Sequence, residues 1–438
     1  MRVPPELTRA RQTLPAPLLD VLRRLGDAGH RSWIVGGAVR DLLLHRPREA
    51  ADFDLATPAT PQEVTALFPK VVPTGIEHGT VTVVSGGFAI EVTTFRGEGP
   101  YVDGRRPESV TFHRDLAADL ERRDFTMNAL AWDPLADDFQ DPHGGRADMG
   151  KRIVRAVGDP AERFAEDGLR PMRAVRFAAQ LGYDLAPATR RAIPGAIPVV
   201  ARVATERISE ELSRLVVAPD APRAIFLMRT TRLLEAVLPA FAALPVQAQD
   251  HAALVVGHLP SDPALRFAGL LHPLGADAVE QVLEGLRQPR RVSDEAAALV
   301  RAHACRLGAP GPVLPPSPVH VRRWLSAAGP GRGSGLLALA KAEVAARPAR
   351  EVPAAQAEVQ ELQAALAQMA LDRPALTPQE LALDGRRAME VLGVPPGPQV
   401  GEAIRHLLDR VLDDPELNRR EALEDELRRW WAERARGG

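Results

Sequence analysis

Two aspartates, Asp52 and Asp54, flank Phe53 in the run ADFDLATP and could together bind a metal ion. In a strand, residues two apart share a face, so both carboxylates project together while Phe53 points into the core. Neighbouring carboxylates repel each other unless a cation lies between them, and Mg2+ prefers carboxylate, water and phosphate oxygens. An isolated pair of this kind is more often a solvated strand face, so the surrounding motifs decide between the two interpretations.

A diglycine turn precedes this pair, in the run GGAVRD at residues 36–41. Gly36 and Gly37 follow a short apolar run, let a ligand approach the backbone closely, and lead into a helix whose first N–H groups suit a phosphate. Further on, Glu91 interrupts the apolar run FAIEVTTF, either as a third metal-site acid or as the gatekeeper of an edge strand. Strand, diglycine, helix and paired aspartates in this order predict a nucleoside triphosphate site with Mg2+.

The elements that must position these residues are strands near the N-terminus and helices after them. The β-branched runs FDLAT, TVTVVSG and FAIEVTTF predict strands within residues 16–130, and LLDVLRRLGDAG predicts an amphipathic helix. Beyond about residue 150 the strand pattern ends and helical patterns rich in alanine, leucine and arginine take over. The proline-dense stretch at residues 309–320 predicts a linker.

Composition limits the remaining possibilities. The 438 residues are 45% apolar, carry a formal net charge of −2 and contain one cysteine, Cys305, which excludes a disordered chain and an internal disulfide. No stretch approaches the roughly 18 apolar residues of a membrane span, so we expect a cytoplasmic protein with no membrane association. Of the 55 basic residues 52 are arginine, which suits phosphate contacts, although a GC-rich coding bias would produce the same excess.

Six motifs follow one another between about residues 32 and 215: GGAVRDLLL, DFDLAT, TGIEHGTVTV, DLERRDFTMNALAWD, EDGLRPMRAVRFAAQLG and ERISEELSRLV. In this order they resemble the motifs of class II tRNA nucleotidyltransferases, the CCA-adding enzymes, and of the related bacterial poly(A) polymerases. The run LDGRRAMEVLG near the C-terminus is similar to the tail of CCA-adding enzymes. The resemblance implies an α/β nucleotidyltransferase head of the polymerase-beta-like type at residues 1–148. All-α neck, body and tail domains would follow at residues 149–215, 216–320 and 321–438.

The resemblance also implies a reaction and its residues. The 3′-hydroxyl of a tRNA attacks the α-phosphate of ATP or CTP and releases pyrophosphate. Asp52 and Asp54 would bind two Mg2+ ions, with Glu91 as the accompanying strand acid, and these three are the expected catalytic residues. Nucleotide binding is assigned to Gly36, Gly37, Arg40, Arg122, Arg123, Asp124, Asp167, Arg170, Arg173 and Arg176.

The run EDGLR at residues 166–170 matches the family element that selects the base without a template. Cytosine and adenine present an amino donor beside a ring-nitrogen acceptor, whereas uracil and guanine present a carbonyl beside an N–H donor. On a helix Asp167 could accept from the amine while Arg170 donates to the ring nitrogen; an ordinary surface ion pair is the alternative. Because Pro171 is tolerated only in a first turn, the helix either begins around Asp167 or is kinked there.

The helical part supplies candidate RNA contacts. Its arginines could contact phosphates of the tRNA acceptor and TψC arms, although solvated helix faces explain them almost as well: Arg287, Arg290, Arg291, Arg322, Arg323, Arg386 and Arg387. The polar stretch after Phe95, through Arg114, predicts a mobile loop, which in the family is needed to switch from C to A addition.

Two further features of the helical part predict packing. The runs DHAALVVGHLP and GLLHPLG are similar to a metal-dependent phosphohydrolase pattern, but Pro273 stands where that pattern has aspartate. We therefore expect no hydrolytic metal site there, and a packing role for His272. Trp430 and Trp431 are expected to pack between helices and not to stack on bases.

These observations together predict a Mg2+-dependent CCA-adding enzyme that acts on tRNA with CTP and ATP. An enzyme that adds only A and a poly(A) polymerase are the nearest alternatives. A non-catalytic RNA-binding protein on the same fold is an alternative of another class. The tail motif favours tRNA as substrate, and the intact carboxylates favour catalysis.

Overall fold

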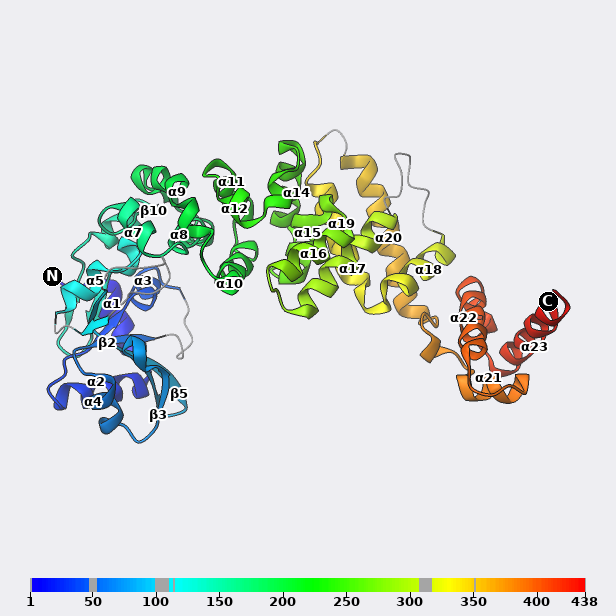
Figure 1. The fold of residues 1–438 in the computed structure, drawn as a ribbon, viewed down its shortest axis with the longest axis horizontal. Helices are drawn as coiled ribbons and strands as arrows, with labels where there is room; N and C mark the ends of the chain where they lie inside the picture. Colours follow the sequence, from blue (N-terminus) through cyan, green and yellow to red (C-terminus); the bar gives the residue numbers. More distant parts are fainter. Residues whose placement is uncertain are drawn as a thin grey trace. The chain divides into compact units, whose positions relative to one another are not determined.

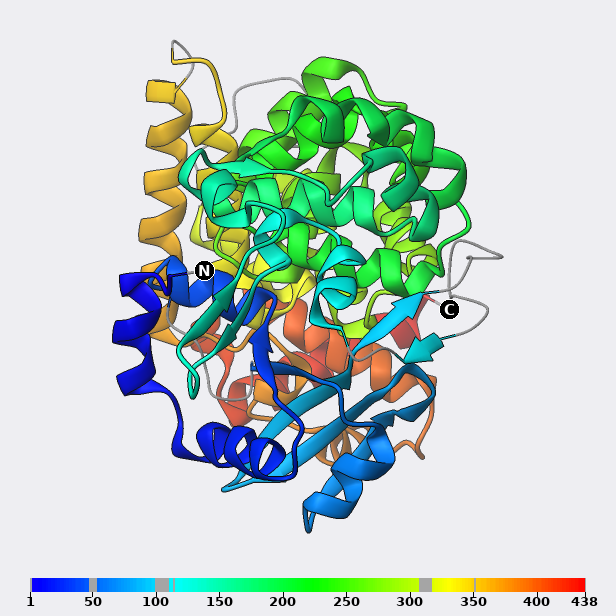
Figure 2. The same cartoon turned by 90° about the vertical axis from the view of Figure 1, so that its left-hand side faces the viewer.

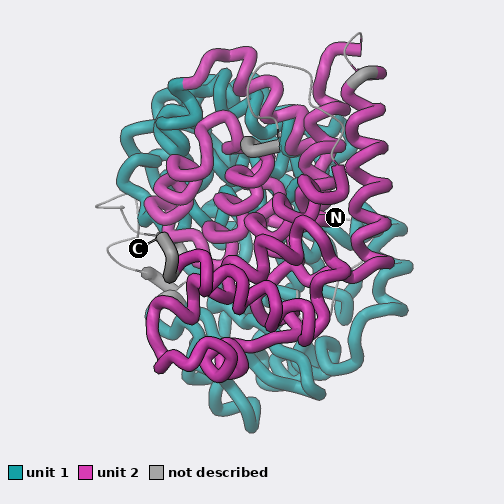
Figure 3. Tube along the Cα trace, turned by 90° about the vertical axis from the view of Figure 1, so that its right-hand side faces the viewer, with its two compact units in different colours: residues 1–243 teal, residues 244–438 magenta. Residues whose placement is uncertain are grey.

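The computed structural model describes residues 2–46, 53–98, 110–112, 115–306, 317–349 and 352–437. The chain separates into two compact units, which we call unit 1, residues 1–243, and unit 2, residues 244–438 (Figures 1 and 3). The strands of the described chain all belong to unit 1, and unit 2 is helical. The expected α/β head followed by a helical remainder is confirmed, whereas the finer division at residues 148, 215 and 320 stays a prediction.

A seven-stranded mixed sheet lies at the centre of the head, in the order β3-β4-β5-β2-β1-β8-β9 (Figure 2). Its strands are β1 (Trp33–Val35), β2 (Asp54–Thr57), β3 (Val71–Gly75), β4 (Thr80–Ser85), β5 (Phe88–Thr94), β8 (Ala131–Asp133) and β9 (Asp138–Gln140). β2 and β5 run parallel, and the other described pairs of this sheet are antiparallel. The short strands β1 and β2 are therefore internal, and β1 ends where the diglycine turn begins.

Helices α2 (Ala16–Asp27) and α4 (Pro61–Leu67) pack against β4. The apolar positions of α2 recur at helical spacing, and Leu18, Val21, Leu22 and Leu25 are all buried. This is the amphipathic helix that the sequence predicts, and its apolar stripe provides the burial that holds it on the sheet.

The remaining elements of unit 1 are mostly helical. They are α1 (Pro5–Ala10), α3 (Gly37–Leu43), α5 (Leu116–Glu121), η4 (Thr126–Asn128), α6 (Gly145–Gly150), α7 (Pro160–Glu166), α8 (Arg170–Leu181), α9 (Pro187–Val200), α10 (Thr205–Val216), α11 (Ala221–Thr230), α12 (Leu233–Val237) and α13 (Pro239–Ala242). A short parallel ladder joins β10 (Ile153–Val154) to β11 (Asp184–Leu185). Nine of the twelve residues of α8 are buried, so this helix is a central support of unit 1.

The stretch expected to be only a loop contains two short paired strands. β6 (Arg96–Glu98) and β7 (Val110–Phe112) form an antiparallel ladder with Arg96 opposite Phe112. Residues 99–109 and 113–114 lie outside the described residues. The expectation of a simple loop is therefore wrong at both of its ends, because backbone pairing satisfies the polar groups there.

Unit 2 is built from helices (Figure 1). They are α14 (Val246–His258), α15 (Pro263–Leu271), η5 (His272–Leu274), α16 (Ala276–Gly285), α17 (Arg290–Arg306), α18 (Pro318–Ala328), α19 (Gly333–Ala345), α20 (Val352–Asp372), α21 (Gly385–Leu392), α22 (Pro398–Asp413) and α23 (Arg420–Gly437). The predicted linker is too long at its C-terminal end, because Pro318 begins α18 and the Ser317 side chain accepts a hydrogen bond from the His320 N–H. Proline is compatible with the first turn of a helix, which proline content alone does not reveal. No helix in the described part of the chain has both the length and the apolar character needed to cross a bilayer.

The C-terminal helices confirm the packing prediction for Trp430 and assign a structural role to one arginine. Trp430 packs on the core formed by α21, α22 and α23, and its ring stacks on His406 with centroids 5.2 Å apart. Arg322 is buried and donates hydrogen bonds to the Leu412 and Asp413 carbonyl oxygens at 2.6 and 2.9 Å, at the end of α22. Arg322 therefore caps a helix and is removed from the candidates for RNA contact.

The close packing of α6 on η4 generates a stability prediction. A Cβ on Gly145 would lie 2.1 Å from the Thr126 carbonyl oxygen, whereas a Cβ on Gly150, in the same helix, meets nothing within 4 Å. We expect Gly145→Ala to lower the free energy of unfolding by about 1–3 kcal/mol, because the backbone must shift. Gly150→Ala is the matched control and should leave it unchanged or slightly higher. Urea unfolding followed by circular dichroism tests both, and equal stability of the two variants would contradict the prediction.

Candidate nucleotide-binding site

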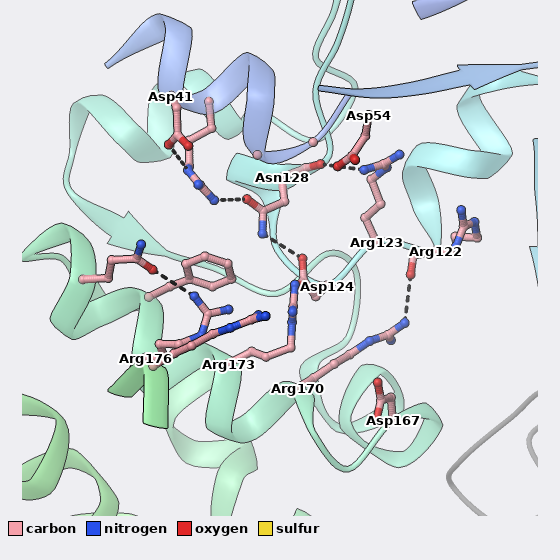
Figure 4. A pocket seen from close by; sticks show the side chains of 16 residues that line it. Asp41, Asp54, Arg122, Arg123, Asp124, Asn128, Asp167, Arg170, Arg173 and Arg176 are labelled. Atoms are coloured by element: carbon pink, nitrogen blue, oxygen red, sulfur yellow. Dashed lines mark hydrogen bonds and ion pairs between the residues drawn. The ribbon is translucent and has the colours of Figure 1, made fainter. Parts of the chain in front are cut away.

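A cavity of about 660 Å3 in unit 1 collects most of the residues that the sequence singles out (Figure 4). Seven arginines and four aspartates line it, so its charged groups carry an excess of positive charge suited to a polyphosphate. Its lining is Gly36, Gly37, Arg40, Asp41, Asp54, Arg122, Arg123, Asp124, Asn128, Asp167, Arg170, Arg173, Arg176, Phe177, Gln180 and Arg214. All ten residues expected to bind the nucleotide are in this set, although their roles are not thereby tested.

The diglycine turn forms part of the cavity wall. Gly36 follows β1, has a φ of 69° and is the N-cap of α3, while Gly37 is the first residue of that helix. A Cβ on Gly36 would lie 2.7 Å from the Arg123 Nη1 atom. The positive φ favours glycine, and the turn brings backbone and guanidinium together at one point of the wall.

Asp54 and Glu91 stand opposite each other on neighbouring strands. β2 and β5 are parallel with Asp54 in register with Glu91, so the two carboxylates project from the same face of the sheet. Both residues are exposed, while Phe53 beside Asp54 is buried, as the alternation predicts. β5 lies between β4 and β2, so the interpretation of Glu91 as the gatekeeper of an edge strand is wrong.

Asp52 lies outside the described residues. Its place beside Asp54 on one strand face stays a prediction, and β2 as described begins only at Asp54. The described residues of this acidic group are therefore Asp54, which lines the cavity, and Glu91, its neighbour across the parallel pair.

A continuous chain of hydrogen bonds crosses the cavity from α3 to α8 (Figure 4). The Arg40 Nη1 donates to Asn128 Oδ1 at 2.7 Å, Asn128 Nδ2 donates to Asp124 Oδ1 at 3.0 Å, and Arg173 Nε donates to Asp124 Oδ2 at 2.8 Å. Burial alone would raise the pKa of Asp124, but the charge of Arg173 and the Asn128 hydrogen bond prevail and lower it. Asp124 is therefore an ionised carboxylate that orients two arginines. Asn128 was not predicted, although it stands within the quoted motif DLERRDFTMNALAWD.

A second buried carboxylate, Asp119, orients another pair of arginines. It accepts hydrogen bonds from Arg122 Nη2 at 2.6 Å and from Arg123 Nη2 at 3.1 Å. Burial acts to raise the pKa of Asp119, but the charges of Arg123 and Arg122 lower it below its ordinary value of 3.8. The sequence analysis missed Asp119, and the signal for it was available: it precedes the two arginines by three and four residues, the spacing of neighbours on a helix.

Asp167 lies between α7 and α8, Arg170 begins α8, and the Arg170 N–H donates a hydrogen bond to the Asp167 carbonyl oxygen at 3.0 Å. Asp167 is the C-cap of α7 in an extended conformation and accepts from the Leu169 N–H and from Arg207 Nη2, the latter at 2.9 Å. Arg170 begins α8 and donates to Glu166, to the Arg163 carbonyl and to the Arg122 carbonyl. The expectation of one helix face shared by both residues is wrong. Pro171 stands in the first turn of α8, so the helix starts at this point and is not kinked.

Arg176 forms a buried ion pair behind the cavity. Its Nε donates to Glu211 Oε2 at 2.6 Å, and its guanidinium lies 4.1 Å from the centre of the Phe177 ring. Glu211 comes from α10, so this pair ties α8 to α10 while the Arg176 side chain still lines the cavity. The ion pair holds Arg176, which the family resemblance assigns to nucleotide binding, in place. Its partner, Glu211, was not identified from the sequence.

The comparisons with known proteins agree with this geometry. The model of the poly(A) polymerase head domain matches residues 32–155, and that of the probable RNA- and SrmB-binding site of polymerase A matches residues 182–244. The CCA-adding enzyme of Geobacillus stearothermophilus is 39% identical over 92% of this chain and 94% of its own length. That of Geobacillus thermodenitrificans is 38% identical over 95% and 96%. The crystal structure of the Bacillus stearothermophilus CCA-adding enzyme in complex with CTP, 34% identical, aligns over 99% of this chain and 100% of that chain with a TM-score of 0.77.

The fold and the cavity therefore define a nucleotidyltransferase with a poly(A) polymerase type of head followed by a helical chain. The identity to the two CCA-adding enzymes extends over nearly the whole length of this chain, so the family can be named more specifically. The chain belongs to the family of CCA-adding enzymes, the tRNA nucleotidyltransferases.

The lowered pKa of Asp119 predicts a pH-dependent stability. A carboxylate whose pKa is lower in the folded than in the unfolded protein stabilises the fold at pH values above its unfolded-state pKa. This stabilisation is lost as the pH falls through its folded-state pKa. We expect Asp119→Asn to lower the free energy of unfolding at pH 7 by about 2–3 kcal/mol, since bonds to charged partners are lost. The difference from wild type should narrow as the pH falls below the ordinary value of 3.8 and through the lower pKa of the folded state. Glu121→Gln, at an exposed position of the same helix, is the control, and a difference that does not vary with pH in urea unfolding would contradict the assignment.

Proposed function

We propose that this protein adds the CCA end to tRNA, with CTP and ATP as donors and with Mg2+ as cofactor. The observation that carries the proposal is the arginine-rich cavity with the Asp54 carboxylate in its wall. The relatives that match over most of the chain are CCA-adding enzymes, and the solved relative at 34% identity was crystallised in complex with CTP. Activity on tRNA would place the protein in the cytoplasm.

The acidic residues fit a magnesium site by their chemistry. Asp54 and Glu91 offer carboxylate oxygens from two adjacent strands in register, and hard oxygen donors are what Mg2+ prefers. Together with Asp52 they would hold the metal beside the triphosphate. Bound there, Mg2+ lowers the pKa of an attacking hydroxyl and neutralises charge on the phosphates.

The remaining work falls to positioning by the chain itself. Arg40, Arg122, Arg123 and Arg173 have guanidinium groups held by Asn128, Asp119 and Asp124, so they need little reordering to contact phosphate oxygens. Gly36 leaves room for the Arg123 guanidinium beside the backbone of the turn. A preorganised cationic wall stabilises the charge that develops as pyrophosphate leaves.

Base selection is proposed for Asp167 and Arg170. Both side chains line the cavity, and each has another partner, Arg207 for Asp167 and Glu166 for Arg170. A base amine would share the Asp167 carboxylate with Arg207, while an Arg170 N–H would turn towards the ring nitrogen. Uracil and guanine would meet acceptor against acceptor and donor against donor, which leaves buried polar groups without partners.

The tRNA body is proposed to contact unit 2 through exposed arginines. Arg290 and Arg386 are 92% and 84% exposed, and the carboxylates nearest to them lie 3.5 and 3.7 Å away. Exposed pairs of this kind are weak, so both guanidinium groups are available to the phosphates of the acceptor and TψC arms. Arg323 and Arg387 form closer bonds with Asp413 and Glu424 and are the weaker candidates.

Loss of the Asp54 carboxylate tests the catalytic proposal. We expect Asp54→Ala to reduce incorporation of labelled CTP and ATP by at least a thousandfold, because metal and triphosphate lose a ligand. Asp27→Ala, at an exposed position of α2, is the matched control and should retain full activity. Substrates are tRNAs ending at the discriminator base, at C and at CC, with products resolved on a gel. Retained turnover in Asp54→Ala would refute the proposal.

The same gel separates the related activities. Extension of all three tRNAs to a complete CCA end supports the main proposal. Extension of only the CC-ended tRNA indicates an enzyme that adds A alone, and long adenosine tails indicate a poly(A) polymerase, the activity after which the matching head family is named. Binding of tRNA without incorporation in the presence of Mg2+ indicates a non-catalytic RNA-binding protein.

Base selection has a separate test in Asp167→Asn. An amide can donate as well as accept, so we expect the preference for CTP and ATP over UTP and GTP to fall at least tenfold. Glu162→Gln, at an exposed position in the first turn of α7, is the control and should keep the preference. The ratios of kcat/KM for the four nucleotides measure the effect, and an unchanged ratio in Asp167→Asn would remove this residue from base selection.

A further inference from the structure

A cluster of three histidines and one glutamate lies within unit 2. His251 comes from α14, His272 from η5, His303 from α17 and Glu343 from α19. Their Nε2 atoms face one oxygen, Glu343 Oε1, at distances of 3.2, 3.1 and 3.9 Å respectively. The side chains of His303 and Glu343 are only 4% and 10% exposed. Four segments of the chain thus bring nitrogen and oxygen donors to one partly buried point.

The spacing of these atoms matches the coordination sphere of a small divalent cation. Zn2+ binds histidine nitrogen and carboxylate oxygen at about 2.0–2.1 Å with tetrahedral geometry, which places the ligand atoms about 3.3–3.4 Å apart. Ligand atoms of His251, His272 and Glu343 all lie within 4.8 Å of one another, and His303 Nε2 lies outside this group of three, 3.9 Å from Glu343 Oε1. The neighbouring rings are nearly perpendicular, at 76° and 85°, so they approach the common point from different directions.

The hydrogen bond on the other side of the His272 ring is decisive. Its Nδ1 lies 2.8 Å from the Gly269 carbonyl oxygen, which can only accept, so Nδ1 carries the proton. In the neutral ring, Nε2 then presents a lone pair to a carboxylate oxygen only 3.1 Å away. Two lone pairs at this distance need a positive charge between them. A backbone carbonyl that orients an imidazole in this way is the usual support of a metal-ligating histidine.

Two cations could supply that charge, a proton on the ring or a metal ion. A proton on one ring would pair with the carboxylate and leave the lone pairs of the other rings without a partner, whereas one divalent ion can accept all of them. A single divalent ion among neutral rings leaves one excess charge and satisfies every donor atom.

We propose that His251, His272, His303 and Glu343 bind one divalent transition-metal ion of the zinc type. A fourth ligand from His303, after a small movement of its ring, would leave no open position, which is typical of a structural site. The ion would join α14, η5, α17 and α19, although His251 and Glu343 are 92 residues apart in the chain. The expectation that Pro273 removes a hydrolytic metal site stays a prediction, while the proposal gives His272 a ligand role in place of the expected packing role.

The test uses the full chain after removal of metal with a chelator. Zn2+ titrated against a chromophoric competitor should bind at one equivalent with submicromolar affinity, and Co2+ should give the intense visible absorption of a tetrahedral nitrogen-rich site. The measurement is repeated in Asp54→Asn, which removes a carboxylate of the head, and the result should be the same. Octahedral oxygen ligands in the head would give only weak Co2+ absorption.

Variants locate the site. His272→Gln and Glu343→Gln should each weaken Zn2+ binding at least a hundredfold, and His303→Gln at least tenfold. His258→Gln, at an exposed position of α14, is the matched control and should bind as wild type does. Zn2+ should also raise the melting temperature of the wild type and of His258→Gln, but not of Glu343→Gln.

Three results would overturn the proposal: no binding of Zn2+ or Co2+ at micromolar concentration, affinity that the cluster variants do not change, or a Co2+ spectrum of octahedral type. The first would leave the cluster as a charged hydrogen-bond network. If the variants do not fold, the wild-type Co2+ spectrum decides alone, because tetrahedral nitrogen-rich ligation has no other source among the described clusters of such side chains.

Discussion

Two buried carboxylates, Asp119 and Asp124, hold the arginines of the cavity in place. Guanidinium groups remain charged at any physiological pH and repel one another, so several of them share one cavity only if anions lie among them. Asp119 binds Arg122 and Arg123, while Asp124 binds Arg173 and, through Asn128, reaches Arg40. Each carboxylate is kept ionised by the charges it organises, in spite of its burial. The arginines still outnumber the aspartates, and this excess suits a polyphosphate.

The same network joins the sheet to the helices that follow it. Arg40 lies in α3, which follows β1, and Arg173 lies in α8. Asp124 lies before η4, and Asn128 is the last residue of η4. Glu211 extends the connection to α10 through Arg176. The geometry of the cavity therefore depends on electrostatic bonds between elements far apart in the chain, and a change in one carboxylate affects arginines on several elements.

In unit 2 a carboxylate is surrounded by imidazole groups and not by guanidinium groups. Glu343 gathers three imidazoles around one oxygen, whereas the aspartates of unit 1 gather guanidinium groups. Guanidinium groups cannot coordinate a cation, so the unit 1 arrangement suits an anionic ligand, while imidazole nitrogens have lone pairs and suit a metal ion. Buried carboxylates therefore support both sites. The side chains around each carboxylate decide whether the site suits an anionic or a cationic ligand.

Local sequence determined the order of elements, and the family resemblance indicated ten of the residues that line the cavity. The alternation around Phe53, the glycine pair at residues 36 and 37 and the periodicity of α2 depend on neighbours within a few residues, and the structure agrees with each. Tertiary structure alone decided that Glu91 lies inside the sheet beside Asp54, because strand order is set by pairing between distant segments. It also decided that Asp167 and Arg170 belong to a helix end and a helix start, with Arg207 and Glu166 as partners. Tertiary structure alone also decided the histidine cluster, because its members come from four separate segments. A local sequence pattern does not show which side chains meet when helices pack.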